Sequence, residues 1–221
     1  MPPPRLVVLI SGRGRNLQAL IEAQRDGRIP AEFAAVVCNR AEAAGLDHAR
    51  AAGIPCEVVP HTQYPSRVAF DAALAETLRR LRPDIVALAG FMRILTDGFV
   101  REFEGRMLNI HPSLLPKYPG LDTHRRAVEA GDAEHGATVH FVTPTLDSGP
   151  AVIQGGVALR PGEGAEALAD RVMEEVELKI YPQALAWMAR GELKLDAGAA
   201  AWRGRRLHRP LSLQDLEEAF R

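Results

Sequence analysis

Residues 6–21 read LVVLI-SGRGRN-LQALI, and this stretch decides the fold. Leu6 to Ile10 is an uninterrupted aliphatic run, which is typical of a strand buried on both faces of a parallel sheet. Leu17, Leu20 and Ile21 then recur at helical spacing. Strand, glycine-rich turn and helix together predict the first half of a β-α-β unit.

The turn between that strand and helix suits an anion. The first N–H groups of the helix are free and lie at its positive dipole end, which favours a phosphate. Gly12 and Gly14 allow the backbone to approach a ligand closely. Arg13 and Arg15 add positive charge, although both side chains also fit a solvated position. A tight turn without a ligand has the same pattern, so the residues alone leave both interpretations open.

The rest of the chain continues the alternation of strands and helices. Together these segments predict an α/β fold, a doubly wound, mostly parallel, Rossmann-like sheet with helices on both faces. We expect a single domain over residues 1–221, with a C-terminal hairpin around Arg203-Gly204 and a short helical tail within 192–221. Strands are expected over 33–38, 56–59, 85–89, 107–110, 137–142 and 151–159, and helices over 41–53, 67–81, 123–130, 165–188 (kinked or broken at Pro182) and 212–220.

Composition is that of an ordinary globular protein. The 221 residues are 47% hydrophobic and 25% charged, and the formal net charge is -1. Such a chain can bury a core, and it has no global field that attracts nucleic acid or a membrane. Cys38 and Cys56 lack metal-ligand spacing and are too few for a disulfide framework, so we expect two buried thiols. No secretory signal or membrane-spanning run is present, and we expect a cytoplasmic protein.

The stretch 107–120, MLNIHPSLLPKYPG, carries the first chemically active pair. Its apolar start is typical of the end of a buried strand, where Asn109 and His111 would point to the same side. An amide can donate to a developing oxyanion, and an imidazole can exchange a proton near neutral pH. In isolation the pair favours a structural interpretation, with a capping Asn and a surface His. Only the other motifs of the chain favour a catalytic site.

Three loops are predicted to meet at the carboxyl ends of the strands, where ligands bind in such sheets. They are the glycine turn, the segment GFMRIL at 90–95 and the stretch around Asn109 and His111. The segment 90–95 surrounds one Arg with apolar side chains. This composition fits either a slot for a flat heterocycle or a helical turn that packs inward. Asp147 lies in a turn-rich loop and Glu177 in a helix, and alone each has an ordinary structural explanation.

Together these segments resemble the phosphoribosylglycinamide formyltransferase family, folate-dependent enzymes of purine biosynthesis. The segment NIHPSLLP is similar to that of folate formyl-transferring enzymes in general, and the glycine turn with KYPG narrows the resemblance to this family. It extends from the first strand to the hairpin near Leu207, with one departure at Arg15, where the family usually has Ser. The matching segments are VLISGRGRN at 8–16, LAGFMRIL at 88–95, LNIHPSLLPKYPG at 108–120, HGATVHFV at 135–142 and LDSGP at 146–150.

The resemblance implies transfer of the formyl group of 10-formyltetrahydrofolate to the amine of 5'-phosphoribosylglycinamide, without a metal. It assigns catalysis to Asn109, His111 and Asp147. It assigns the substrate's phosphate to Gly14, Arg15 and Asn16, and its ribose or glycinamide to Glu177. The partners implied are these two small molecules, with no nucleic acid and no membrane, and a monomer or homodimer. The folate is expected against Arg67, Met92, Arg93, Ile94, Leu95, Asn109, Thr143, Pro144, Thr145, Leu146 and Asp147.

The residues fit this chemistry independently. Attack of an amine on a formyl carbonyl passes through a tetrahedral intermediate with an oxyanion, which Asn109 and His111 can stabilise. A nearby carboxylate favours the protonated imidazole, and this gives Asp147 a role. The attacking amine loses a proton and the leaving folate nitrogen gains one, and His111 with Asp147 can carry it, if need be through a water.

Other functions are less consistent with the sequence. A formyltetrahydrofolate deformylase is the main alternative, and we would expect it to carry a regulatory domain before the first strand. A methionyl-tRNA formyltransferase would need an RNA-binding domain after Leu207 and a basic charge. A nicotinamide-dependent dehydrogenase would need a third glycine and an acidic residue closing the second strand, where Leu17 and Asn39 stand. A non-catalytic folate-binding module would not need the three catalytic side chains.

Overall fold

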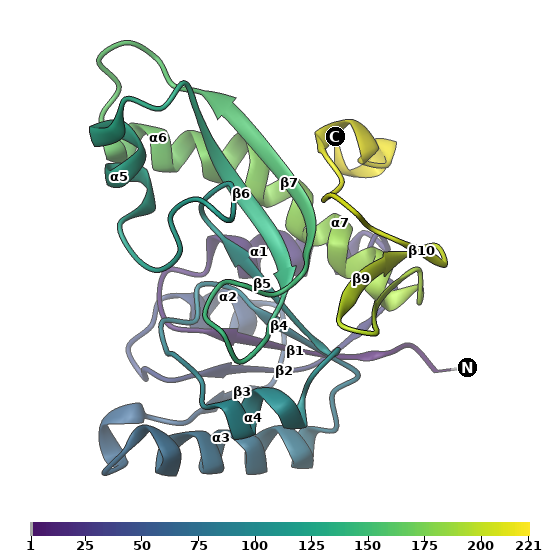
Figure 1. Ribbon diagram of the computed structural model, residues 1–221. Coiled ribbons are helices and arrows are strands. Elements are labelled where there is room, and N and C mark those ends of the chain that lie inside the picture. Colours follow the sequence, from purple (N-terminus) through teal and green to yellow (C-terminus); the bar gives the residue numbers. More distant parts are fainter. Residues whose placement is uncertain (1) are drawn as a thin grey trace.

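The computed structural model describes residues 2–221 (Figure 1). Its strands are β1 (Arg5–Ile10), β2 (Glu32–Cys38), β3 (Cys56–Val58), β4 (Ile85–Leu88), β5 (Met107–His111), β6 (Glu134–Phe141), β7 (Ala151–Ala158), β8 (Leu193–Asp196), β9 (Ala199–Trp202) and β10 (Arg205–Arg206). Its α-helices are α1 (Arg15–Arg25), α2 (Gly45–Ala51), α3 (Arg67–Leu81), α4 (Asp97–Glu102), α5 (Thr123–Ala130), α6 (Ala165–Val172) and α7 (Leu178–Ala189).

The central sheet has seven strands in the order β3-β2-β1-β4-β5-β6-β7. The pairs from β3 to β5 are parallel, and β6 and β7 complete the sheet as antiparallel strands. The chain builds outward from β1 in one direction and from β4 in the other, so the strand order reverses between these two strands. The mostly parallel, doubly wound sheet predicted from the sequence is confirmed, and its ligand crevice is expected at this reversal.

The two faces of β1 explain why helices cover both sides of the sheet. Leu6, Val8 and Ile10 are buried in one core cluster together with residues of α1, α2 and α7. Val7 and Leu9 point the opposite way, into a second cluster with residues of α3 and α4. Figure 1 shows α3 and α4 below the sheet and α1 and α7 above it. An unbroken aliphatic strand is therefore needed because neither face meets water.

Two helices differ from the sequence prediction. α2 begins only at Gly45, because that residue docks on the glycine turn, with its N–H donating to the Gly12 carbonyl at 2.9 Å. α6 and α7 form one continuous helical run through Pro182, with a π-helical turn at Met173–Glu177 between them. Of the kink or break predicted at Pro182, the break is absent, and the interruption of the α-helical pattern lies before Leu178. The short α4 was not predicted.

The C-terminal region is also more elaborate than predicted. β8, β9 and β10 form a three-stranded antiparallel sheet, so the hairpin has a second turn besides the expected one at Arg203-Gly204. The predicted helix over 212–220 is instead two 3-10 turns, Leu213–Asp215 and Glu218–Phe220. Leu216 and Phe220 are buried there against the core that contains α7. Of the two cysteines, Cys38 is buried as expected, but Cys56 is only half-buried.

Candidate active site

Strand β5 presents its two polar residues on one side. Leu108 and Ile110 enter the core cluster that contains α7, so the alternation of a strand turns Asn109 and His111 to the other side. The following segment folds back beside them. The Ser113 hydroxyl donates to the Lys117 carbonyl at 2.6 Å, which makes Ser113 a turn residue.

His111 lies between two acceptors. Its Nε2 is 2.9 Å from the Tyr118 carbonyl, and its Nδ1 is 3.5 Å from an Asp147 carboxylate oxygen. An acceptor facing each ring nitrogen matches the doubly protonated imidazolium, since a neutral ring has only one N–H. The side chains of His111 and Asp147 are 7% and 8% exposed, so little water reaches the space between the ring and the carboxylate. The structure therefore brings together the imidazole and the carboxylate expected from the sequence.

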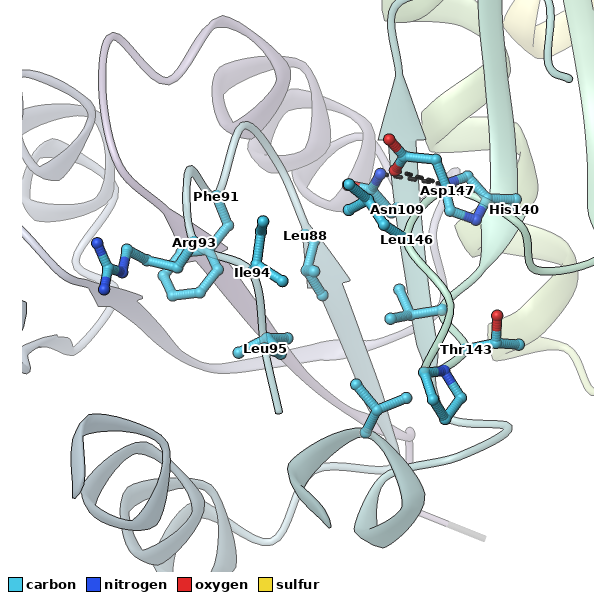
Figure 2. Close-up of a pocket in the computed structure, with 13 residues that line it drawn as sticks. Leu88, Phe91, Arg93, Ile94, Leu95, Asn109, His140, Thr143, Leu146 and Asp147 are labelled. Atoms are coloured by element: carbon cyan, nitrogen blue, oxygen red, sulfur yellow. Dashed lines mark hydrogen bonds and ion pairs between the residues drawn. The ribbon is translucent and has the colours of Figure 1, made fainter. Parts of the chain in front are cut away.

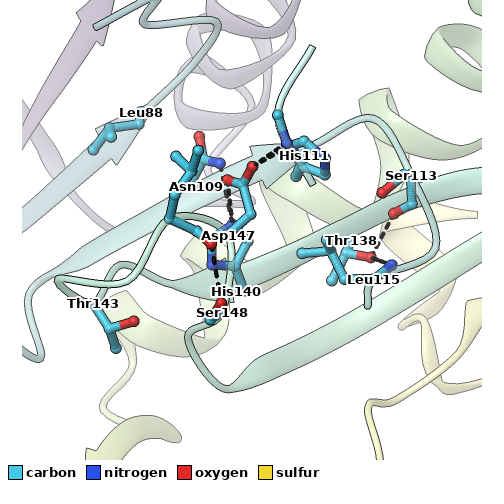
Figure 3. A network of polar contacts seen from close by, with 12 residues as sticks. Leu88, Asn109, His111, Ser113, Leu115, Thr138, His140, Thr143, Asp147 and Ser148 are labelled. Carbon is cyan, nitrogen blue, oxygen red and sulfur yellow. Dashed lines mark hydrogen bonds and ion pairs between the residues drawn. The ribbon is translucent and has the colours of Figure 1, made fainter. Parts of the chain in front are cut away.

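Asp147 is held in this position by its own loop and by the segment after β5. Its backbone is left-handed, with a φ of 49°. Its carboxylate accepts the Gly120 N–H at 2.8 Å. A charge-assisted bond of this kind holds the carboxylate toward the His111 ring, as Figure 3 shows. Two loops that are distant in sequence are thereby joined at the site.

Asn109 is oriented by His140, a residue to which the sequence analysis gave no role. His140 stands directly opposite Asn109 in the pairing of β5 with β6. Its Nδ1 bonds the Phe141 carbonyl at 2.9 Å, and its Nε2 lies 3.1 Å from the Asn109 amide nitrogen. These partners assign the proton to Nδ1, so Nε2 accepts one amide N–H of Asn109. The second N–H of that amide stays available to a ligand.

Burial keeps His140 neutral. It lowers the pKa of the His140 ring more than the Phe141 carbonyl and the Asp147 carboxylate raise it. A neutral ring is needed, because a doubly protonated ring could not accept from Asn109. The signal in the sequence was the alternating strand predicted at 137–142, but only the β5–β6 register shows which residue stands opposite Asn109.

An apolar pocket opens beside these polar groups (Figure 2). Eight of the eleven residues expected at the folate line it, namely Arg93, Ile94, Leu95, Asn109, Thr143, Pro144, Leu146 and Asp147. Leu88, Phe91, Val100, His140 and Val142 complete the lining. The other three expected residues, Arg67, Met92 and Thr145, are exposed and outside the lining.

Arg93 is the cationic group of this pocket. Its guanidinium lies over the Phe70 ring, 5.7 Å from the centroid, and Arg93 has no ion pair with any of residues 2–221. Its buried Nε also has no hydrogen-bond partner within that range. The segment 90–95 is thus both an apolar wall, as one reading of the sequence predicted, and the carrier of an unpaired cation.

The glycine turn is packed in the way an anion site requires. Gly14 has a φ of 79°, and a Cβ there would lie 2.6 Å from the Gly45 Cα, so only glycine fits. Helix α1 begins directly after it, with no side-chain cap and no acidic residue in its first turn. The first N–H groups of α1 therefore remain free for a ligand.

Asn16 and Glu177 meet next to this turn. The Asn16 amide donates to the Glu177 carboxylate at 2.7 Å, and the amide oxygen, also buried, has no partner among residues 2–221. Burial raises the pKa of Glu177, against the smaller opposing effects of Asn16 and Arg15. Glu177 ends the π-helical turn, and such turns are frequent at functional sites. The structure thus places both expected substrate residues together.

Arg15 does not point freely into solvent. Its guanidinium bonds Asp170 at 2.8 Å and Glu174 at 3.1 Å, both carried by the helical run above α1. The side chain that departs from the family pattern is therefore occupied by two carboxylates.

No helix in the described part of the chain has the length and apolar character needed to cross a membrane. Across residues 2–221, no group of three or more His, Cys, Asp or Glu side chains is arranged to hold a metal ion.

Comparison with known proteins places the chain among relatives of one kind. Residues 4–185 match the Formyl transferase family. The phosphoribosylglycinamide formyltransferase of Escherichia coli (strain K12) is 48% identical over 202 residues, covering 91% of this chain and 95% of that protein. The human trifunctional purine biosynthetic protein adenosine-3 is 45% identical over 90% of this chain, which spans only 20% of that longer protein.

Solved structures agree with these sequence relatives. The phosphoribosylglycinamide formyltransferase of Coxiella burnetii, in complex with CHES, superposes with a TM-score of 0.90 at 45% identity. That match covers 95% of this chain and 99% of the other. The glycinamide ribonucleotide transformylase 1 of Symbiobacterium toebii gives a TM-score of 0.87 at 45% identity, over 90% and 94% of the two chains. With the fold, the site and the relatives in agreement, this chain belongs to the formyl transferase family.

Proposed function

We propose that this protein transfers the formyl group of 10-formyltetrahydrofolate to the amine of 5'-phosphoribosylglycinamide, in purine biosynthesis in the cytoplasm. The observation that carries the proposal is the cluster of Asn109, His111 and Asp147 at the edge of an apolar pocket. The glycine turn, with its free helix N-terminus, supplies a separate place for the phosphate of the second substrate. A transfer reaction needs a binding site for each substrate and a cluster of polar groups that acts on both.

The pocket lining fits the folate. A flat heterocycle can lie between the apolar side chains of Ile94, Leu95 and Leu146, with the polar groups of the cluster at one end. The unpaired guanidinium of Arg93 suits an anionic tail such as the glutamate of a folate. Three expected residues are exposed and lie outside the lining. By this proposal they contact the folate only where it leaves the pocket, and they are Arg67, Met92 and Thr145.

Catalysis follows from the charges in the cluster. The amine attacks the formyl carbon, and the carbonyl electrons become an oxyanion that the free N–H of Asn109 and protonated His111 stabilise. The Asp147 carboxylate lies 3.5 Å from the ring, within reach of the proton that the ring exchanges. As the intermediate collapses, the C–N bond to the folate breaks, and the folate nitrogen takes up one proton while the former amine loses one. His111 and Asp147 relay these protons.

The second substrate, 5'-phosphoribosylglycinamide, is held at the glycine turn rather than in the folate pocket. The first N–H groups of α1, at Arg15 and Asn16, bind its phosphate, and Gly14 lets it approach. Glu177 and the unpartnered oxygen of Asn16 accept hydrogen bonds from the ribose hydroxyls or the glycinamide amine. The active protein is a monomer or a homodimer.

The proposal is tested with purified protein, 5'-phosphoribosylglycinamide and 10-formyltetrahydrofolate, following both the absorbance change of the folate and the formylated product. We expect turnover only when both substrates are present. No transfer with both present would overturn the proposal. Formate release from the folate alone, without the ribonucleotide, would instead identify the deformylase-like hydrolase that is the alternative reading.

A further inference from the structure

The ion pairs of Arg15 join the turn proposed for the phosphate to a different helix. Arg15 is the first residue of α1, and its carboxylate partners Asp170 and Glu174 lie in α6 and the π-helical turn. The next residue of α1, Asn16, bonds Glu177 at the end of the same turn. Two consecutive residues of α1 are therefore held by three carboxylates of one helical run.

The Arg15 ion pairs are exposed and easily exchanged. The Arg15 side chain is 36% exposed, and those of Asp170 and Glu174 are 64% and 66% exposed. Ion pairs in such surroundings contribute little to stability, so breaking them costs little. A phosphate dianion carries more charge than either carboxylate and offers a guanidinium two parallel hydrogen bonds. A phosphate at the N-terminus of α1 would therefore be a stronger partner for Arg15.

The two carboxylates also act on the phosphate itself. Arg15 starts at the same helical turn whose N–H groups are free for an anion, so its side chain begins beside that anion. Asp170 and Glu174 hold the guanidinium in their own ion pairs, and their negative charges repel a dianion bound at the same helical turn as Arg15. Both effects weaken phosphate binding, but only the first one needs Arg15.

We propose that Asp170 and Glu174 compete with the substrate's phosphate for the Arg15 guanidinium, and that Arg15 changes partners when the substrate binds. This competition sets the affinity for the phosphorylated substrate, and Asp170 and Glu174 are specificity-determining residues although neither touches the reacting atoms. The inference rests on the proposed function in taking the anion at the glycine turn to be the phosphate of that substrate.

The test is a double-mutant cycle with inorganic phosphate as the probe, its dissociation constant measured by calorimetry at low salt. The variants are Arg15→Gln, the pair Asp170→Asn with Glu174→Gln, and all three together. Glu175→Gln is the matched control, because Glu175 lies on the same π-helical turn but bonds Arg171 instead. Thermal unfolding of each variant verifies that it folds.

We expect Arg15→Gln to weaken phosphate binding about threefold to tenfold, and the Asp170/Glu174 pair to strengthen it by about as much. Without Arg15, neutralising the two carboxylates should strengthen phosphate binding by less than about twofold, since only their repulsion of the phosphate is then relieved. Glu175→Gln should leave the dissociation constant unchanged. Added salt should shrink all these differences. With both substrates, the changes should fall on the KM for the ribonucleotide and not on kcat.

The inference is overturned if neutralising Asp170 and Glu174 leaves phosphate affinity unchanged or weaker, or if the gain is the same with and without Arg15. Failure of the wild-type protein to bind phosphate also overturns it. Phosphate titration needs no turnover, so the two proposals fail separately. If the protein transfers the formyl group but the phosphate effects are absent, only the inference is rejected. If the phosphate effects are present but no formyl group is transferred, the proposed function is rejected.

Discussion

At the scale of single residues, the site depends on polar groups that are almost completely buried. The side chains of His111, His140 and Asp147 are all less than a tenth exposed. Burying such groups costs several kcal/mol unless each finds a partner, roughly 2–7 kcal/mol for a neutral one. Here each has one: Tyr118 for His111, Asn109 for His140 and Gly120 for Asp147. The same contacts that satisfy these groups also fix their orientation toward a substrate.

The pairing of His111 with Asp147 leads to the first prediction. His111→Ala removes the proton donor, and Asp147→Asn removes the carboxylate beside the ring that relays the proton, so each should lower kcat by about a hundredfold or more. Because the two act as a unit, the double variant should lose little more than either alone. Steady-state kinetics with both substrates measures this, and a near-normal kcat in either single variant would contradict the roles assigned.

His140 gives a second prediction at this scale. His140→Phe keeps an aromatic ring but removes the acceptor that holds the Asn109 amide. The amide then loses its orientation toward the oxyanion, and kcat should fall by about tenfold or more, with a smaller change in the KM for the folate. His208→Phe, at an exposed histidine, is the control and should behave as wild type. A higher KM for the folate with an unchanged kcat would show that His140 serves binding rather than orientation.

At the scale of elements, the C-terminal tail acts as part of the core. Leu216 and Phe220 are each 4% exposed, and the Arg28 guanidinium lies over the Phe220 ring. Glu217 between them accepts hydrogen bonds from Trp187 of α7 and from Arg190. Between the two 3-10 turns the backbone is extended at Leu216 and Glu217, and the Glu217 N–H donates to the Gln183 side chain of α7 at 2.8 Å.

The tail therefore carries a stability prediction. Leu216→Ala and Phe220→Ala should each lower the free energy of unfolding by about 2–5 kcal/mol, because each leaves a cavity against α7. Denaturant unfolding followed by circular dichroism measures the change. Glu218→Ala, at an exposed position of the same turn, should stay within about 0.5 kcal/mol of wild type. Equal effects of the three substitutions would mean that the tail is not part of the core.

At the scale of the whole molecule, the antiparallel pair β6 and β7 extends the sheet away from its parallel half. Figure 1 shows α5 and α6 near the far end of this pair. The 90–95 segment and the loop 143–148 come from two different connections of the fold yet line the same pocket, and Ser11 of the glycine turn accepts the Met92 N–H at 2.8 Å. The strand order, rather than any local motif, is what brings these segments to one edge of the sheet.

Several buried histidines make the stability of the whole chain depend on pH. Burial lowers the pKa of His124 to about 4, helped by the charges of His135 and His111. Burial also lowers the pKa of His135 and of His140. Between the ordinary histidine pKa of 6.5 and about 4, the unfolded chain binds protons that folded His124 does not. The stabilising contribution of neutral His124 is complete above 6.5 and is lost as the pH falls through this window.

We therefore expect the free energy of unfolding to fall from pH 6.5 toward pH 4, and His124→Asn to reduce that slope. Urea unfolding at a series of pH values measures it for both proteins. Glu177, whose pKa burial raises, acts in the opposite direction in both proteins, so the difference between them isolates the histidine. Identical slopes would show that His124 does not titrate differently in the folded state.

Much of the fold could be predicted because its determinants are local. The boundaries of α3 and α5 agree with the sequence prediction, since hydrophobic spacing and the flanking residues act within a few turns. The start of α2 was wrong because it depends on a contact with Gly12, more than thirty residues earlier. The predicted helix of the tail was wrong because the chain is extended at Leu216 and Glu217, where the Glu217 N–H donates to the Gln183 side chain of α7 instead of a helical carbonyl.

The sequence by itself determined the buried strands, the glycine turn, and the amide, imidazole and carboxylate that the proposed chemistry needs. Each of these follows from the nature of a residue and of its near neighbours in the chain. Only the tertiary structure decided which groups face each other: His140 opposite Asn109, and Arg15 bound to carboxylates 155 and 159 residues away. Such partners depend on strand register and helix packing, which arise from the summed burial of the whole core and leave no pattern at either residue.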